Sequence, residues 1–252
     1  MKILTAIAVS LAVTAGAAQA APVDLSTWIS EDGFGTQPPA NWNLAGDNNS
    51  VTQTVNSDPG VFYDGNGSSQ GKALSGTIRV NTASDDDFIG FVLGFDNGEL
   101  NGTAASTDYW LVSWKQGNQN HLGEFAAAGL SLSHVTGTDP TGADLWGHVG
   151  VVNEVKRGTS LGNVGWSDLT EYTFDLIFTS TLIQVWVNGA LEISHAGNFE
   201  DGGFGFFNYS QTNVTYAGIE EDVAPGIPLP AGLPLMLAGL GAFGLASRRR
   251  KG

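Results

Sequence analysis

Short runs of alternating apolar and polar residues constrain the fold of this chain more than any other feature. They recur throughout residues 22–222, separated by Gly, Asn, Asp and Ser, and no amphipathic helical stretch of convincing length interrupts them. Successive side chains of a strand point to opposite faces of a sheet, so this period-two pattern predicts strands with one buried face. The clearest runs cover residues 77–80, 88–95, 109–115, 172–178, 182–188, 190–194, 203–209 and 214–219.

The spacing of these runs predicts an all-β domain. Asn188-Gly189 lies between two of them and predicts a tight hairpin, because a type I′ turn needs positive φ at both central residues. Many short strands in about 200 residues favour two packed sheets, that is, a β-sandwich. No internal repeat or interdomain linker is visible, so we expect a single domain over residues 21–222.

Charge limits the partners that such a domain can have. The chain carries 25 Asp and Glu residues against 10 Lys and Arg, a net charge of −15, and half of the basic residues lie near its two ends. An acidic body repels nucleic-acid phosphates and anionic lipid and attracts hard cations. We therefore expect no nucleic-acid partner. The chain contains no Cys, which excludes disulfides, thiol catalysis and Cys-ligated zinc.

Residues 1–20 have the features of a secretory signal peptide. Lys2 gives a basic start, an apolar stretch follows, and Ala18-Gln19-Ala20 is a small-residue ending that predicts cleavage after Ala20. The alternative is a buried N-terminal helix. The signal peptide predicts that the protein is exported.

The pattern of residues 223–252 predicts a spacer, a single membrane span and a basic tail. Ile227-Pro228-Leu229-Pro230-Ala231 precedes an apolar run that ends at residue 246, and basic residues occupy 248–251. The run is barely long enough to cross a bilayer as one apolar helix, and the basic cluster fits the positive-inside rule. This order resembles the bacterial PEP-CTERM class of sorting signals in its VPLPA variant, with Ile227 in place of the usual Val.

That resemblance implies processing by an exosortase-type enzyme, with release to or retention at the outer surface, often beside exopolysaccharide. We therefore expect an extracellular or outer-surface protein that contacts the membrane only through its tail, which anchors it transiently. A permanent single-span anchor is the alternative.

Several blocks of the body form a recognisable series. The first opens with Trp42-Asn43-Leu44 and continues at residues 51–60. The others cover residues 76–82, 85–95, 109–116, 145–146, 163–166 and 203–211. Together these blocks resemble the thrombospondin C-terminal domain, in the order of that family and over roughly residues 23–221. The resemblance implies a jelly-roll sandwich of the concanavalin or L-type lectin kind that binds calcium and serves extracellular adhesion or matrix contacts. The aspartate repeats and cysteines of the animal proteins are absent, as is any Arg-Gly-Asp motif, so integrin binding is not expected.

Asp85-Asp86-Asp87 is the first candidate calcium site. Three adjacent carboxylates repel one another, and a calcium ion with its six to eight oxygen ligands offsets that repulsion. All three can reach one ion only if the run is a loop, because neighbouring strand residues point to opposite faces. Asn56 and Asp58 in an Asn-Ser-Asp-Pro-Gly turn are further candidates. The alternatives are a solvated turn at Asp85–Asp87 and Asx-turn chemistry at Asn56 and Asp58.

Signals of catalysis are weak. The four His residues are scattered along the sequence. Gly67-Ser68-Ser69-Gln70-Gly71 fits a nucleophile motif, but it lies in a predicted loop, whereas the motif requires a strand-to-helix turn. No Glu-x-Asp-x-x-Glu signature of sandwich glucanases occurs. We therefore expect a calcium-binding adhesion or matrix-binding protein, not an enzyme, with extracellular matrix, exopolysaccharide or a surface protein as its partner. A polysaccharide-binding lectin, with one or two Trp residues stacked on sugar rings, is the main alternative, and a glycan-active enzyme is the third.

Overall fold

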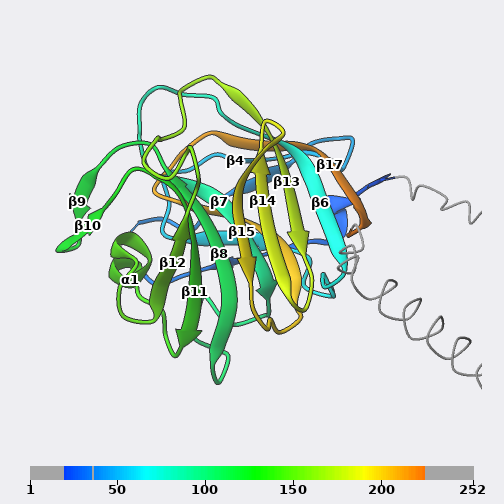
Figure 1. Ribbon diagram of the computed structural model, residues 1–252. Coiled ribbons are helices and arrows are strands. Elements are labelled where there is room, and N and C mark those ends of the chain that lie inside the picture. The colour runs from blue at the N-terminus through cyan, green and yellow to red at the C-terminus, as the bar shows by residue number, and fades with distance from the viewer. Residues whose placement is uncertain (1–19, 36, 225–252) are drawn as a thin grey trace, which may run out of the picture.

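The computed structural model describes residues 20–35 and 37–224 (Figure 1). The predicted sorting signal, its membrane span with the C-terminal apolar helix, and nearly all of the predicted signal peptide lie outside these residues. Within the described ranges, no helix is long and apolar enough to cross a membrane.

Two antiparallel sheets form the body, which confirms the predicted all-β sandwich (Figure 1). Sheet A has the strand order β15-β14-β13-β6-β17-β4-β3, with β1 paired to β17. Its strands are β1 (Ala21–Pro22), β3 (Trp42–Leu44), β4 (Val51–Gln53), β6 (Lys72–Val80), β13 (Glu171–Phe178), β14 (Leu182–Val187), β15 (Ala190–Ala196) and β17 (Val214–Val223).

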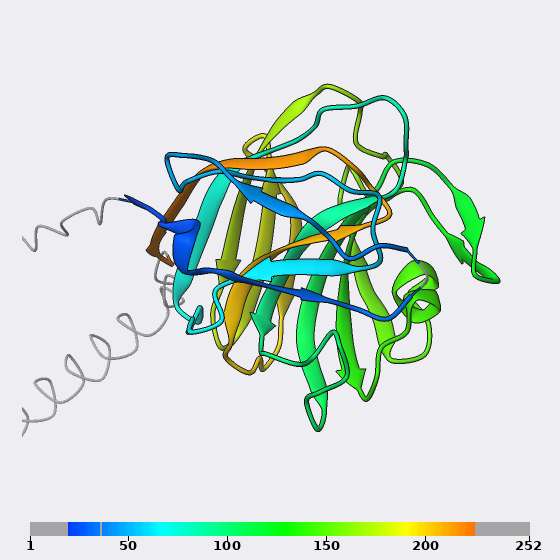
Figure 2. The same cartoon turned by 180° about the vertical axis from the view of Figure 1, so that it is seen from behind.

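Sheet B has the strand order β12-β11-β8-β7-β16-β5-β2. Its strands are β2 (Ile29–Asp32), β5 (Gly60–Tyr63), β7 (Phe88–Phe95), β8 (Thr107–Lys115), β11 (Gly129–Gly137), β12 (Val152–Arg157) and β16 (Gly203–Tyr209). Outside the two sheets lie a separate hairpin of β9 (Gln119–His121) and β10 (Glu124–Ala126), the short helix α1 (Gly142–Gly147) and the 3-10 helix η1 (Leu25–Thr27). The N-terminal segment, blue in Figure 2, crosses the molecule towards α1, where Phe34 pairs with Thr141.

The main core lies between the sheets and follows the alternation of the strands. Leu74 and Ile78 of β6, together with Phe174 and Leu176 of β13, point into it, while the alternate residues Ser75, Thr77 and Asp175 face outward. A second core covers the outer face of sheet B. There Leu100 and the α1 residue Trp146 pack on strand residues such as Tyr109. Strands β7 and β16 are therefore buried on both faces, which explains their nearly continuous apolar sequences.

Local sequence patterns account for several elements. Strands β7 and β16 have the predicted bounds, and Asn188 and Gly189 both adopt positive φ, 49° and 74°, in the turn between β14 and β15. Helix α1 was not expected. It has only six residues, and a capping box between Thr141 and Asp144 satisfies its first backbone donors. The Gly-x-Ser-x-Gly sequence lies in a loop, as predicted, where Ser69 donates to the carbonyl of Gly202.

Candidate functional site

The loop between β6 and β7 brings three carboxylates together. Asp85, Asp86 and Asp87 lie in irregular backbone just before β7, and one oxygen of each lies within 4.8 Å of the others. Asp85 and Asp86 are half-buried, whereas Asp87 is only 3% exposed. Since the run is a loop, all three side chains turn to the same side. The condition for a shared cation is therefore met.

Of the two other predicted ligands, the fold brings one to this cluster. The Asn56 side-chain amide donates to Asp85 Oδ2 at 2.5 Å, and its Oδ1 accepts from Ser210 Oγ at 3.1 Å. Asp58 lies elsewhere. Its Oδ1 accepts from the backbone N–H of Gln37 at 3.2 Å, and its charge contributes to the raised pKa of Asp32, of which burial is the main cause. The five predicted residues thus divide into a cluster of four and a separate Asp58.

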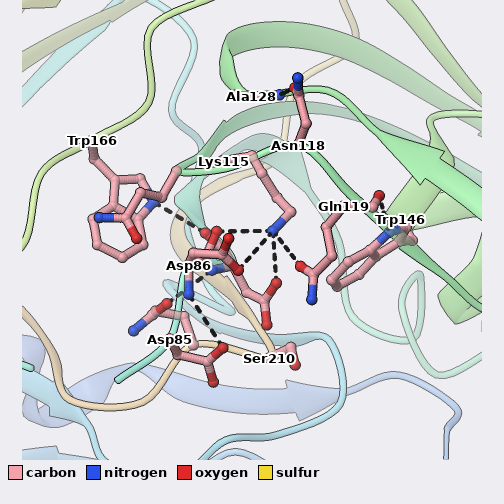
Figure 3. Close-up of polar contacts among 12 residues, drawn as sticks. Asp85, Asp86, Lys115, Asn118, Gln119, Ala128, Trp146, Trp166 and Ser210 are labelled. Atoms are coloured by element: carbon pink, nitrogen blue, oxygen red, sulfur yellow. Dashed lines mark hydrogen bonds and ion pairs between the residues drawn. The ribbon is translucent and has the colours of Figure 1, made fainter. Parts of the chain in front are cut away.

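A buried lysine that the sequence did not single out completes the cluster. Lys115, at the end of β8, has no exposed surface, and its Nζ lies 2.7 Å from Asp87 Oδ1 and 3.6 Å from Asp86 Oδ1 (Figure 3). Its Nζ also donates to the carbonyl oxygen of Asp86 at 2.8 Å and to Gln119 Oε1 at 2.7 Å. The same ammonium lies 4.9 Å from the ring centroid of Trp146. The only hint in the sequence is a lysine at the end of a largely apolar strand.

Three carboxylates and one ammonium leave the cluster with a formal charge of −2. Burial and the neighbouring charge of Asp87 raise the pKa of Asp85 to about 6, so ionising this group is costly without a further cation. Oxygens of Asp85 and Asp86 and the second oxygen of Asp87 remain as ligand atoms, whereas Asn56 turns its NH2 group to Asp85 and its Oδ1 to Ser210. An all-oxygen donor set of this charge fits a hard divalent cation such as calcium.

A second polar network lies beside α1 and joins a serine, a histidine and a glutamate. Ser113 Oγ lies 3.2 Å from His148 Nε2, and His148 Nδ1 lies 3.2 Å from Glu154 Oε2. Arg157 holds the same carboxylate through two hydrogen bonds of 2.9 Å. Ser113 is only 1% exposed and shares its hydroxyl with Ser131, so a substrate has no access to it. This hydrogen-bond network therefore links the end of α1 to β8 and β12.

Acid is expected to weaken this link. Burial alone would raise the pKa of Glu154, but hydrogen bonds from His148 and Arg157, with their charges, lower it to about 2. A carboxyl whose pKa is lower in the folded state stabilises the protein above its unfolded pKa, near 4.5, and loses that effect as the pH falls towards 2. In urea titrations, the stability difference between wild type and Glu154→Gln should therefore be full at pH 6 and shrink below about pH 4.5. A constant difference would contradict the assignment.

Comparison with known proteins finds relatives of one family for most of this chain. The family described as Thrombospondin C-terminal region matches residues 37–223. Human thrombospondin-3 is 29% identical over 207 residues, which cover 75% of this chain and 21% of that protein. Mouse thrombospondin-2 is 31% identical over 208 residues, covering 74% of this chain and 17% of that protein. The chain thus spans about a fifth of the length of these relatives.

Solved structures show the same fold at low sequence identity. The carbohydrate-binding module CBM66 from Bacillus subtilis aligns with a TM-score of 0.51 and 9% identity, covering 74% of this chain and 94% of that one. The exoplasmic/lumenal domain of VIP36, in its Ca2+/Man2-bound form, aligns with a TM-score of 0.50 and 9% identity, covering 82% and 85%. These similarities show the same β-sandwich fold.

Proposed function

This chain belongs to the thrombospondin C-terminal region family, and from that premise we propose that it is an exported calcium-binding protein that makes adhesive or matrix contacts outside the cell. One observation carries the calcium assignment: the carboxylates of Asp85, Asp86 and Asp87 converge within 4.8 Å although Lys115 neutralises only one of them. A binding role is also consistent with the burial of Ser113, the serine of the Ser-His-Glu network.

In this proposal, calcium joins segments that are distant in sequence. Asp85–Asp87 lie before β7, Asn56 lies between β4 and β5, and Ser210, which donates to Asn56, follows β16. A cation bound by the carboxylates would hold these loops in one arrangement, and Asn56 would join as a ligand by rotating its amide so that Oδ1 faces the cation. Lys115 would keep Asp87 in place. The ordered loop surface would then present a fixed shape to a matrix or surface partner.

The remaining assignments belong to the same proposal. Residues 1–20 are a signal peptide, residues 21–222 the sandwich, and residues 223–252 a PEP-CTERM-like sorting segment that anchors the protein transiently before it reaches the outer surface. Extracellular matrix, exopolysaccharide and surface proteins are the proposed partners. The polysaccharide-binding alternative is supported by a separate region of the molecule, described in the next subsection.

Calcium should raise the free energy of unfolding of the full-length chain by about 2.7 kcal/mol when it is present at 100 times its dissociation constant. Thermal unfolding with millimolar calcium and with chelator measures this shift. The double variant Asp85→Asn/Asp86→Asn should abolish it, because two anionic ligands are lost.

Asp139→Asn is the matched control. Asp139 is exposed, lies outside the cluster and has φ of 51°, a conformation that Asn tolerates well. This variant should keep the full calcium shift. A wild type that ignores calcium, or a double variant that responds as the wild type does, would rule out the site.

A further inference from the structure

The two sheets differ in how their outer faces are covered. The second core, which includes Leu100 and Trp146, covers the outer face of sheet B. Outward-facing residues of β14, β13 and β6 in sheet A instead line a surface cavity of about 350 Å³. These three strands lie side by side (Figure 1). The cavity is at the lower end of the size range of small-molecule sites, about 300–1,000 Å³.

The register of sheet A sets the chemistry of this cavity. Trp186 of β14 pairs with Asp175 of β13, and Asp175 pairs with Ser75 of β6, so the three form a row across adjacent strands. Facing side chains of paired strands are about 4.5–5.5 Å apart, so an indole, a carboxylate and a hydroxyl lie next to one another. Ile177 of β13, Ala73 of β6 and Val223 of β17 supply an apolar surround.

The polar groups of the row have no partner within the described part of the chain. Neither the Asp175 carboxylate nor the Ser75 hydroxyl makes a hydrogen bond there, and Trp186 is half-buried. Partial burial raises the pKa of Asp175 and no hydrogen bond offsets it. A ligand that brings hydroxyl donors would satisfy this carboxylate.

We propose that the cavity over Trp186, Asp175 and Ser75 binds a neutral hexopyranose unit of a polysaccharide. The C–H face of a pyranose ring is apolar and fits the flat indole of Trp186, while its hydroxyls donate to Asp175 and exchange a hydrogen bond with Ser75. A neutral sugar is favoured because Asp175 and Asp222 line the cavity and no described lining residue is cationic.

This site is separate from the proposed calcium site. Ser75 lies in the first half of β6, whereas Asp85–Asp87 lie in the loop that follows its last residue, Val80. At about 3.3 Å per residue, the strand runs about 16 Å from Ser75 to Val80, and the loop with Asp85–Asp87 begins beyond that end. Saccharide binding is therefore expected to persist in chelator and in Asp85→Asn/Asp86→Asn, so that either proposal can fail without the other.

The test is titration calorimetry of the full-length chain with soluble neutral glucan and galactan oligosaccharides, and with polygalacturonate oligosaccharides as the acidic comparison. We expect a neutral oligosaccharide to bind and the acidic one not to bind. Trp186→Ala should weaken binding at least about tenfold, because most of the apolar contact is lost. Asp175→Ala should weaken it by a similar factor, because a hydrogen bond to a charged group is lost.

Two further variants keep the result interpretable. Trp186→Phe retains a flat ring and should restore most of the affinity, which a purely structural role of Trp186 would not predict. Phe125→Ala removes an aromatic ring that is 53% exposed, on β10 and outside the cavity, and should leave binding unchanged. Absence of binding to every neutral probe, unchanged binding by Trp186→Ala with an intact unfolding transition, or a preference for the acidic probe would overturn the proposal.

Discussion

Replacing Lys115 with Met is expected to lower the free energy of unfolding by about 3–5 kcal/mol in the presence of chelator. Lys115 has no exposed surface, and its ammonium is the only cation within 4.0 Å of the Asp87 carboxylate among the described residues. Met keeps much of the volume but leaves Asp87 buried without its partner. Removal of one member of a buried ion pair costs far more than removal of both.

Urea unfolding of the full-length chain measures this loss. Lys115→Met/Asp87→Asn is the matched control, since it removes both charges and should recover most of the stability. Calcium should also stabilise Lys115→Met more than it stabilises the wild type, because the cluster then carries one more uncompensated negative charge. A loss below about 1 kcal/mol, the level of an exposed ion pair, would show that the pair does not support the fold.

Replacing Glu31 with Leu is expected to cost about 3 kcal/mol, because two buried backbone donors and one half-buried donor lose their acceptor, at about 1–3 kcal/mol for each buried one. Glu31, in β2, is 4% exposed. Its Oε2 accepts from the backbone N–H of Gly98 at 2.6 Å, and its Oε1 accepts from Leu100 at 2.6 Å and Asn101 at 2.9 Å. The carboxylate thus holds the loop that places Leu100 in the second core.

Glu31→Gln is the control for Glu31→Leu, because Gln has nearly the same shape as Glu. It keeps one acceptor oxygen for Leu100 and Asn101 and should cost clearly less than Glu31→Leu. Urea unfolding gives the energies, and hydrogen exchange of the Gly98, Leu100 and Asn101 amides shows where protection is lost. Equal stabilities of the two variants would mean that the carboxylate does not hold the loop.

Glu31 and Lys115 show why parts of the fold and of the site cannot be predicted from the sequence. Glu31 looks like any of the acidic residues of an acidic chain, and only the folded loop reveals three N–H groups aimed at it. Lys115 is one lysine in a strand, and its role depends on Asp87, which lies 28 positions earlier. Asn56 reaches Asp85, whereas Asp58, only two positions away, does not. No short stretch of the sequence reveals these contacts.

Several features follow from the sequence alone: the all-β fold class, the bounds of β7 and β16, the Asn188-Gly189 turn, the resemblance to the thrombospondin C-terminal domain and the run of three aspartates. The alternation of apolar and polar residues and the choice of turn residues act between near neighbours in the sequence. A short stretch of sequence is therefore enough to predict strands and turns. The tertiary structure alone decided which loops meet at Asp85, that Lys115 balances Asp87, and that Trp186, Asp175 and Ser75 form one row. Strand order and register are set by how two whole sheets bury their apolar faces against each other.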